Sequence, residues 1–333
     1  MSLEPTTPHA AVEEYLNNLI GITQSTKNNH ESRLNNFLEW CDQEGITNIN
    51  EVNEQTLLTY RSWRSDQVSP ITLRMCFGTV RKFIDYCETT NRVHQGTAEN
   101  VDLPNVADGE DVDDTVLAVE EAEQILDYLR KYEYATRDHL IFELLWHTGI
   151  RLSALYGFDK DDYNPKDMSI KARHRPETGT ALKNKKKSNR KIALTESVCE
   201  VVDDYLAQNH PGVRDDNGRM PLIGTKSGRA HRTTITKAVY KMTRPCVYSN
   251  ECPVDKDPNT CEHVYNSNAS GCPESVSPHP IRKGYVTKQR NNDWPVQALC
   301  DRVNMSPEVM EKHYDKGTED EKTERRRKFL EDE

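Results

Sequence analysis

The sequence predicts a mainly α-helical protein with a small β-sheet, arranged as two domains. Its 333 residues exceed the length that one hydrophobic core usually organises. Apolar residues recur at helical spacing in 1–92 and again over much of 116–333, whereas 93–115 loses this periodicity in a run of Gly, Pro, Asn and acidic residues. Such a composition is typical of an exposed linker, so we place the domain boundary there.

The expected elements follow from the spacing of the apolar residues. Four helices are predicted in the first domain, because three apolar stripes have helical spacing and a further helix fits 54–64. The second domain begins and ends with helical segments, and strand-like stretches lie at 169–173 and 190–194. The stripes of the first domain are Val12, Leu16 and Leu19; Leu34, Phe37, Leu38 and Cys41; and Leu73, Phe77, Val80, Ile84 and Cys87.

Basic and acidic residues are concentrated in different segments of the chain. The 44 basic and 54 acidic residues give a net charge of −10, which alone argues against a nucleic-acid partner. Residues 171–191, however, hold nine Lys or Arg and one acid, whereas 108–123 hold eight acids and no base. A basic face can therefore exist on an acidic protein, and the acidic remainder suits solubility in a salty cytoplasm.

The sequence shows no sign of export or membrane insertion. No apolar run reaches membrane-spanning length, and residues 1–8 lack the charged and apolar regions of a secretion signal. We therefore expect a cytoplasmic protein without membrane contact, whose nine cysteines are mostly reduced. A cluster among reduced cysteines suggests a metal before it suggests disulfides.

Two segments in the middle of the chain carry basic residues in simple local contexts. In 147–153 an apolar helix runs into Thr-Gly and is followed by Arg151. In 183–191 a Lys-rich stretch leads into Ile-Ala-Leu, which is the pattern of a hairpin connection feeding a strand. Taken singly, the first is an exposed arginine and the second a solvated loop.

Two segments near the C-terminus combine residues suited to phosphate chemistry. A Ser-Pro pair at 277–278 starts a helix that puts His279 and Arg282 on one face of its first turn, where the helix dipole favours an anion. A second Ser-Pro pair, at 306–307, starts a short helix that leaves Tyr314 near its end. Each of these features is ordinary by itself.

The order and separation of the four segments resemble the tyrosine recombinase (phage integrase) family, of an archaeal or archaeal-virus type. An arginine is followed by lysines in a hairpin, by a His with an Arg three residues later, and by a C-terminal Tyr. The helical module at 1–92 is similar to that family's SAM-like core-binding domain. The resemblance thus covers nearly the whole chain and implies a DNA-clamp domain at 1–92, a linker at 93–115 and an α+β catalytic domain at 116–333.

The resemblance implies a site-specific DNA recombinase with Tyr314 as the nucleophile, which would form a 3'-phosphotyrosine. Arg151 and Arg282 would hold the non-bridging phosphate oxygens, and His279 would assist the proton of the nucleophile or the phosphate. Lys185 would be the general acid for the leaving oxygen. Its near alternatives are Lys183, Lys186 and Lys187.

Double-stranded DNA is the partner that the resemblance implies, with self-association on DNA as a dimer or tetramer and a nucleoid-associated location. The residues expected to contact DNA are those of the basic hairpin, Lys183, Lys186, Lys187 and Arg190. No cofactor is expected for catalysis, because two arginine side chains can stabilise the negative charge of the transferring phosphoryl group without a metal. A phosphotyrosine also preserves the bond energy for religation, and the sequence has no Walker-type phosphate loop.

Two positions depart from the family pattern. Members usually carry an acid three residues after the first Arg, where this chain has Ala154, and His or Trp nine residues before the Tyr, where it has Met305. Met305 removes a donor to the phosphate unless His313 takes that role, and the alternative for Met305 is a gap-filling core residue. These departures favour a second hypothesis, a catalytically weak DNA-binding relative with a regulatory or structural role.

A cysteine-rich insertion at 246–272 predicts a structural zinc site. Four thiolates satisfy tetrahedral zinc, and a loop rich in Asn, Asp, Ser and Pro cannot pack a core, so a metal would supply the missing order. The expected ligands are Cys246, Cys252, Cys261 and Cys272. His263 could replace one of them, and the alternative is free cysteines or a disulfide. Four closed thiolate ligands leave no open position for water, which argues against a zinc hydrolase.

Overall fold

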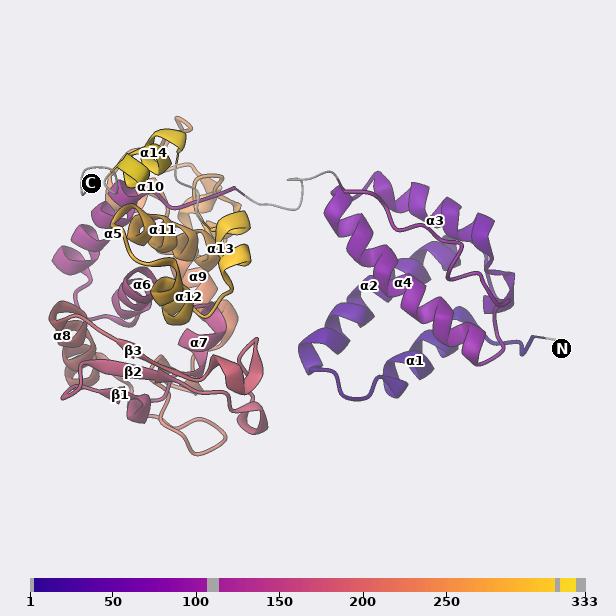
Figure 1. Cartoon of the computed structure of the whole chain (residues 1–333), viewed down its shortest axis with the longest axis horizontal. Helices are drawn as coiled ribbons and strands as arrows, with labels where there is room; N and C mark the ends of the chain where they lie inside the picture. The colour runs from indigo at the N-terminus through magenta and orange to yellow at the C-terminus, as the bar shows by residue number, and fades with distance from the viewer. Residues whose placement is uncertain (1–2, 107–113, 315–317, 328–333) are drawn as a thin grey trace. The chain divides into compact units, whose positions relative to one another are not determined.

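The structure, a computed structural model, describes residues 3–106, 114–314 and 318–327. The chain divides into two compact units, residues 1–113 and 114–333 (Figure 1). Helices predominate in both, and short antiparallel strands occur in the second, so the predicted mainly α-helical fold with a small β-sheet is confirmed. In the described ranges no helix is both long and apolar enough to cross a membrane.

The first unit is a four-helix module with a single hydrophobic core. Side-chain caps from Thr7, Thr23 and Asn53 accept backbone N–H groups in the first turns of three of its helices, which satisfies donors that have no partner within the helix. The elements are α1 (Pro8–Asn18), α2 (Gln24–Glu44), the 3₁₀ turn η1 (Ile49–Glu51), α3 (Glu54–Ser65) and α4 (Pro70–Thr89).

Aromatic rings form the centre of this module. The ring of Phe37 meets Tyr60 edge to face at 5.2 Å and Phe83 at 6.0 Å between ring centres, a geometry that aromatic quadrupoles favour. The side chains of Val93, Ala98 and Val101 also pack into this core. The segment that we expected to be an exposed linker from residue 93 therefore begins inside the fold of the first unit.

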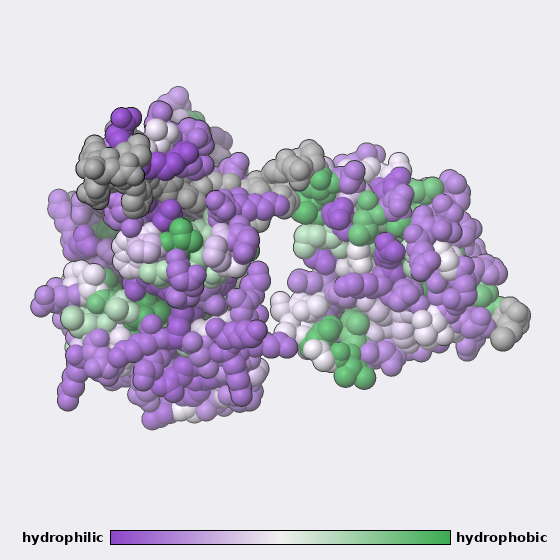
Figure 2. Space-filling view, viewed as in Figure 1, coloured by the Kyte–Doolittle hydropathy of each residue, from purple (hydrophilic) through white to green (hydrophobic). Residues whose placement is uncertain are grey.

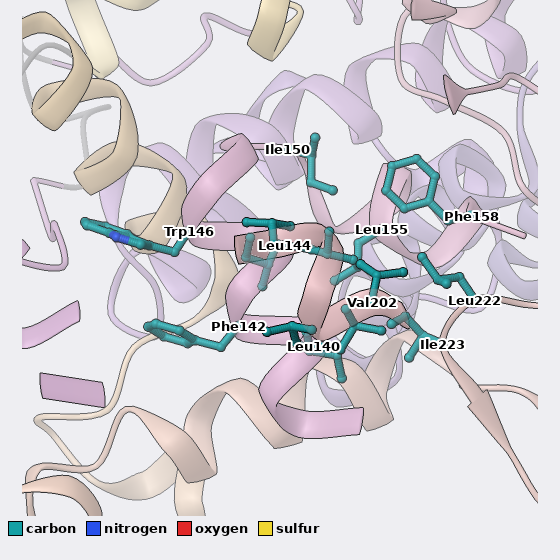
Figure 3. Packing of buried hydrophobic residues seen from close by; sticks show 14 of the residues in the cluster. Leu140, Phe142, Leu144, Trp146, Ile150, Leu155, Phe158, Val202, Leu222 and Ile223 are labelled. Carbon is teal, nitrogen blue, oxygen red and sulfur yellow. The ribbon is translucent and has the colours of Figure 1, made fainter. Parts of the chain in front are cut away.

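Helix α6 lies at the centre of the second unit, and its side chains are buried on nearly every face. Figure 3 shows Leu140 and Leu144 of this helix among Leu155, Val202 and Ile223. The helices are α5 (Val119–Tyr132), α6 (Arg137–Thr148), α7 (Leu152–Gly157), α8 (Glu196–Asp204), the π-helical η5 (Tyr205–Asn209), α9 (Arg232–Met242), α10 (Pro245–Tyr248), α11 (Pro278–Asn291), α12 (Val296–Val303), α13 (Pro307–His313) and α14 (Glu319–Arg327). The 3₁₀ turns are η2 (Lys160–Asp162), η3 (Pro176–Thr178), η4 (Lys185–Ser188), η6 (Glu262–Val264) and η7 (Ala269–Gly271).

A three-stranded antiparallel sheet, in the order β1-β2-β3, contains the predicted hairpin. Ile170 pairs with Ile192 across β2 and β3, and both side chains are buried in the core of the unit. Because side chains alternate along a strand, this register points the neighbouring lysines at 171 and 191 outward. The strands are β1 (Tyr163–Asn164), β2 (Ser169–Ala172) and β3 (Arg190–Ala193), and a second small pair is formed by β4 (Gly224–Thr225) and β5 (Gly228–Arg229).

Two helical glycines provide a test of packing in the two units. We expect Gly284→Ala to lower the free energy of unfolding by about 1–3 kcal/mol, the usual cost of overpacking. A Cβ on Gly284 of α11 would collide with the Leu117 carbonyl and lie 3.0 Å from Trp146 Cζ3. Gly78→Ala in α4 meets nothing within 4 Å and should stabilise its unit by about 0.5–1 kcal/mol through helix propensity. Denaturant melts of both variants measure the two effects, and a neutral Gly284→Ala would contradict the packing described here.

Candidate active site

Tyr314 lies at the C-terminal end of α13, held by main-chain and packing contacts. Ser306 caps this helix by accepting the N–H of Val309 at 3.4 Å, and the Tyr314 carbonyl accepts a hydrogen bond from Thr287 Oγ1 of α11 at 3.0 Å. Its ring packs in a small hydrophobic cluster with Tyr285 and is only 4% exposed. The tyrosine is therefore fixed against α11.

The hydroxyl of Tyr314 forms a hydrogen bond with His279 in the first turn of α11. The distance from Tyr314 Oη to His279 Nε2 is 3.0 Å, and the rings meet edge to face with their centres 5.2 Å apart. In the tautomer whose Nε2 carries no proton, the imidazole accepts the tyrosine proton. The geometry thus pairs a hydroxyl with a group that is able to accept its proton.

Arg282, one helical turn after His279, is a buried cation with unused donors. Its Nη1 donates to the carbonyls of Gly149 at 2.6 Å and Val303 at 2.7 Å. Its Nε and Nη2 are also buried and have no hydrogen-bond partner among the described residues, and its Cζ lies 5.2 Å from the centre of the Tyr314 ring. Burial lowers the pKa of Arg282 to about 9. A buried cation with free donors is suited to binding an oxyanion.

Arg151 lies in the turn between α6 and α7, close enough to Arg282 and Tyr314 for their charges to interact. Gly149 ends α6 in the left-handed conformation, with φ of 60°, and Arg151 then precedes α7. Its Nη1 donates to the carbonyl of Asn304 at 2.7 Å. Burial lowers the pKa of Arg151, and the nearby Tyr314 opposes this shift.

Arg190 lies with these two arginines, although we expected it on the DNA-contacting surface of the hairpin. Its Nε donates to the Arg302 carbonyl at 2.7 Å and its Nη1 to the Ser188 carbonyl at 3.1 Å. Burial, together with the positive charges of Arg151 and Arg302, lowers the pKa of Arg190 to about 10. Strand alternation could have indicated this position, because Arg190 lies two residues before the buried Ile192 and so shares its face.

The four lysines of the hairpin connection, by contrast, are exposed. In the described ranges their side chains form no hydrogen bond or ion pair, including with Tyr314. Figure 2 shows hydrophilic residues covering the β1–β3 side of the second unit. The connection is tethered near the arginines, because Asn304 Nδ2 donates to Ser188 Oγ at 2.7 Å. The lysines are Lys183, Lys185, Lys186 and Lys187.

Residues that the sequence did not single out brace the site. Asn304 ends α12 in the left-handed conformation, with φ of 57°, and its carbonyl and amide hold Arg151 and Ser188. Arg302 donates to the carbonyls of His147 at 3.1 Å and Ala193 at 3.0 Å. An Asn after a helix is a recognisable C-terminal cap, but its two partners are not visible in the sequence.

The two departures from the family pattern lie in apolar surroundings. Ala154 is 5% exposed in the main core. Met305 is partly buried against the cluster that contains Tyr314, and its backbone N–H donates to Cys300 O at 3.1 Å. This packing favours a gap-filling role for Met305. The side chain of His313, the alternative donor, is outside the described residues.

The four clustered cysteines, Cys246, Cys252, Cys261 and Cys272, line one cavity together with His263. All nine cysteines are free, so the structure contains none of the alternative disulfides. As placed, no group of three or more His, Cys, Asp or Glu side chains in the described part of the chain could hold a metal ion.

Two family models match this chain. "Phage integrase family" matches residues 115–318, and "Phage integrase, N-terminal SAM-like domain" matches residues 12–90. The chain belongs to the phage integrase family. Each matched range lies within one of the two units of the structure, so the predicted SAM-like domain and integrase domain are both present in this integrase-family protein.

Known proteins similar to the chain have low sequence identity to it. Tyrosine recombinase XerC 2 of Ralstonia nicotianae is 26% identical over 145 residues, which cover 41% of this chain and 41% of that protein. A protein of Caldanaerobacter subterraneus subsp. tengcongensis, named as a tyrosine recombinase, is 22% identical over 153 residues, covering 45% of this chain and 51% of that protein. The chain thus spans about half the length of these curated relatives, or less.

Solved integrase structures share the fold. The transposon Tn1549 integrase in complex with a circular intermediate DNA has a TM-score of 0.68 at 15% identity, with 97% of this chain and 99% of that chain covered. A lambda integrase dimer bound to a COC' core site has a TM-score of 0.62 at 12% identity, with 97% and 78% covered.

The unused donors of Arg282 predict an anion site. At matched ionic strength, sulfate should raise the melting temperature of the wild type above its value in chloride, and Arg282→Met should lose most of that rise. Anion at ten times its Kd stabilises by about 1.4 kcal/mol, or a few degrees. The general salting effect of sulfate is measured with Arg214→Met, which removes an exposed arginine that donates to Gly218 O. Equal rises in all three proteins would exclude the site.

Proposed function

We propose that this protein is a site-specific DNA recombinase that breaks and rejoins DNA strands through Tyr314. One observation carries this proposal: the Tyr314 hydroxyl is hydrogen-bonded to His279 beside the unpartnered, buried donors of Arg282. The arrangement combines a nucleophile, a base and a binding site for an oxyanion. These are the components that phosphoryl transfer needs when no metal takes part.

In the proposed reaction Tyr314 Oη attacks the scissile phosphorus. The bond from phosphorus to the 5' oxygen breaks, and the products are a 3'-phosphotyrosine and a 5'-hydroxyl. His279 accepts the tyrosine proton, and Lys185 donates a proton to the leaving oxygen; Lys183, Lys186 or Lys187 could donate instead. Attack by a 5'-hydroxyl on the phosphotyrosine reverses each step and restores the phosphodiester, so no nucleotide cofactor is needed.

The arginines stabilise the charge of the transition state. Phosphoryl transfer spreads negative charge over the non-bridging oxygens, and Nε and Nη2 of Arg282 are a pair of parallel donors suited to two of them. Arg151 and Arg190 add positive charge from two other segments of the chain. Because burial has already removed much of the water from Arg282, its interaction with a bound phosphate is strong.

Further parts of the proposal concern partners and source. The exposed hairpin lysines are suited to contact the phosphates of duplex DNA, and the first unit would supply a second DNA-contacting surface. Self-association on DNA, as a dimer or tetramer, is proposed because the similar lambda integrase structure is a dimer bound to DNA. The acidic excess supports an archaeal or archaeal-virus origin and a cytoplasmic, nucleoid-associated protein.

A second candidate function is a DNA-binding relative with weak catalysis and a regulatory or structural role. The apolar surroundings of Ala154 and Met305, where other members of the family have an acid and a donor, favour it. The hydrogen bond between Tyr314 and His279 opposes it. A covalent adduct with DNA distinguishes the two functions.

We expect Tyr314→Phe to abolish the covalent adduct formed with a nicked suicide duplex. The substitution removes the oxygen but keeps the ring that packs against Tyr285, so DNA affinity and the melting temperature should stay near wild type. Adduct is scored on denaturing gels and affinity in a binding titration. Adduct that persists in this variant would place the nucleophile elsewhere, and no adduct with the wild type would favour the second candidate.

Arg190 and Lys186 should affect different steps. Arg190→Ala should slow adduct formation by roughly 10²- to 10³-fold, as expected for loss of an electrostatic stabiliser of the transition state, with little change in the salt dependence of binding. Lys186→Ala should reduce the slope of log affinity against log salt by about one and affect the rate less at saturating DNA. If both variants changed only the salt slope, Arg190 would be a surface DNA contact, as its sequence context suggested.

A further inference from the structure

Residues 244–276, here called the cysteine loop, are an insertion between α9 and α11 that is closed at its base. Thr243 at the end of α9 is buried, and its Oγ1 accepts a hydrogen bond from the Val276 N–H at 3.0 Å. The single hydroxyl proton of Thr243 is shared between the Val239 carbonyl at 2.9 Å and the Val276 carbonyl at 3.3 Å. The two ends of the loop are therefore held together at Thr243 and Val276, and Val276 lies two residues before the start of α11.

The cysteine loop has almost no hydrophobic core. Pro245 and Ala269 are its only fully buried apolar side chains, whereas Val254 and Tyr265 are 40% and 68% exposed. Burial on this scale cannot offset the conformational entropy of ordering a segment of this length. Another interaction must hold the loop together.

Hydrogen bonds from Arg244 fix only the middle of the loop. This buried arginine donates from Nη1 to the carbonyls of His263 and Val264 and from Nη2 to Asn266 Oδ1 at 3.0 Å. Its Nε donates to the carbonyl of Lys241 in α9 at 3.3 Å, so all of its nitrogens have acceptors, unlike those of Arg282. The segments that contain the four cysteines gain no comparable cross-link from hydrogen bonds in the described ranges.

The four cysteines of the loop converge on one cavity of about 170 Å³. Cys246 lies in α10, Cys252 follows that helix, Cys261 precedes η6 and Cys272 follows η7, so each comes from a different turn of the loop. A metal ion is much smaller than this volume and fits within the cavity.

We propose that Cys246, Cys252, Cys261 and Cys272 bind one structural zinc ion in this cavity. Zinc favours four thiolates in a tetrahedron at about 2.3 Å. Because these thiols do not form a group that could hold a metal, binding requires the four sulfur atoms to move closer together. Each thiol that binds gives its proton to solvent, and no electron is transferred. Such a site cross-links four turns of a loop that has no core.

His263 belongs to the wall of the cavity and not to the proposed ligand set. Its ring packs on the backbone of Gly271, where an added Cβ would lie 2.7 Å from Nδ1. Its Nε2 is 3.7 Å from a carboxylate oxygen of Glu262. His263 Nδ1 is buried and has no hydrogen-bond partner among the described residues, so His263 is the alternative to one thiolate. We commit to the four thiolates because they complete a closed structural zinc site by themselves.

The proposed metal also bears on the start of α11. The loop returns to Thr243 through Val276, and the helix that carries His279 begins directly after it. An ordered loop fixes this first turn, so zinc would act there as a positioning element without contacting DNA. This consequence depends on the proposed recombinase function, whereas binding of the metal does not.

Metal content of the full-length protein, purified under reducing conditions without chelator, tests the proposal. We expect about one zinc per chain, and a large loss of it in Cys252→Ser and in Cys261→Ser. Cys76→Ser is the matched control, since Cys76 is a buried cysteine of α4 in the first unit, and it should keep its zinc. Wild-type protein without zinc overturns the site, whether its thiols are free or oxidised to disulfides.

Two further measurements keep the result independent of variant folding. Cobalt exchanged into wild-type protein should give the strong visible bands and thiolate charge-transfer absorption of a tetrahedral thiolate site, and stepwise thiol modification should release the zinc. His263→Ala should retain the metal, and loss of zinc in that variant would overturn the four-thiolate set. If the protein binds no zinc, the recombinase proposal still stands or falls on a separate measurement, the formation of a covalent adduct by Tyr314.

Discussion

The buried guanidinium of Arg282 is the interaction on which the arrangement of the site depends. Through Nη1 it joins α11 to the carbonyl of Gly149, at the end of α6, and to that of Val303, at the end of α12. These carbonyls have no partner within their own helices, so the arginine satisfies main-chain acceptors and brings three segments together. Tyr314 and His279 then meet because α11 carries one and packs against the other.

Burial of this cation lowers the free energy of unfolding, and its unpartnered donors indicate that it is kept for a reason other than stability. The pKa of Arg282 falls to about 9 because burial disfavours the charged form, and the charge of Arg151 adds to this effect. A residue selected for stability alone would use all its donors or be replaced by an apolar side chain. Arg282 instead leaves Nε and Nη2 unpartnered among the described residues, which is the state expected of a site that acquires its counter-charge from a substrate.

The sequence predicted those parts of the protein that depend on local pattern. Apolar periodicity located the helices of the first unit, and alternation around Ile170 and Ile192 located the hairpin. The order of Arg151, His279 and Tyr314 indicated a shared site only through resemblance. The hydrogen bonds that hold the arginines in place could not be predicted. Arg151 and the Asn304 carbonyl, for example, are 153 positions apart in sequence, and neither local propensity nor spacing reports such a contact. The inward position of Arg190 was available from strand alternation, but the lysines around it favoured a surface interpretation.

The acceptors that hold the arginines explain how the site can function without an acid at Ala154. In the described part of the chain, Arg151, Arg190 and Arg282 donate to main-chain carbonyls, those of Asn304, Arg302, Ser188, Gly149 and Val303, and form no ion pair with a carboxylate. A carboxylate would orient a guanidinium and also cancel its charge, whereas a carbonyl dipole orients it and leaves the net charge intact. In the proposed reaction, the C-terminal caps of α6 and α12 would orient the arginines in place of an acid at position 154, and the positive charge would remain for the phosphate. Orientation by carbonyls depends on the helix ends staying in place, which makes the left-handed residues Gly149 and Asn304 as necessary to the charge distribution as the arginines themselves.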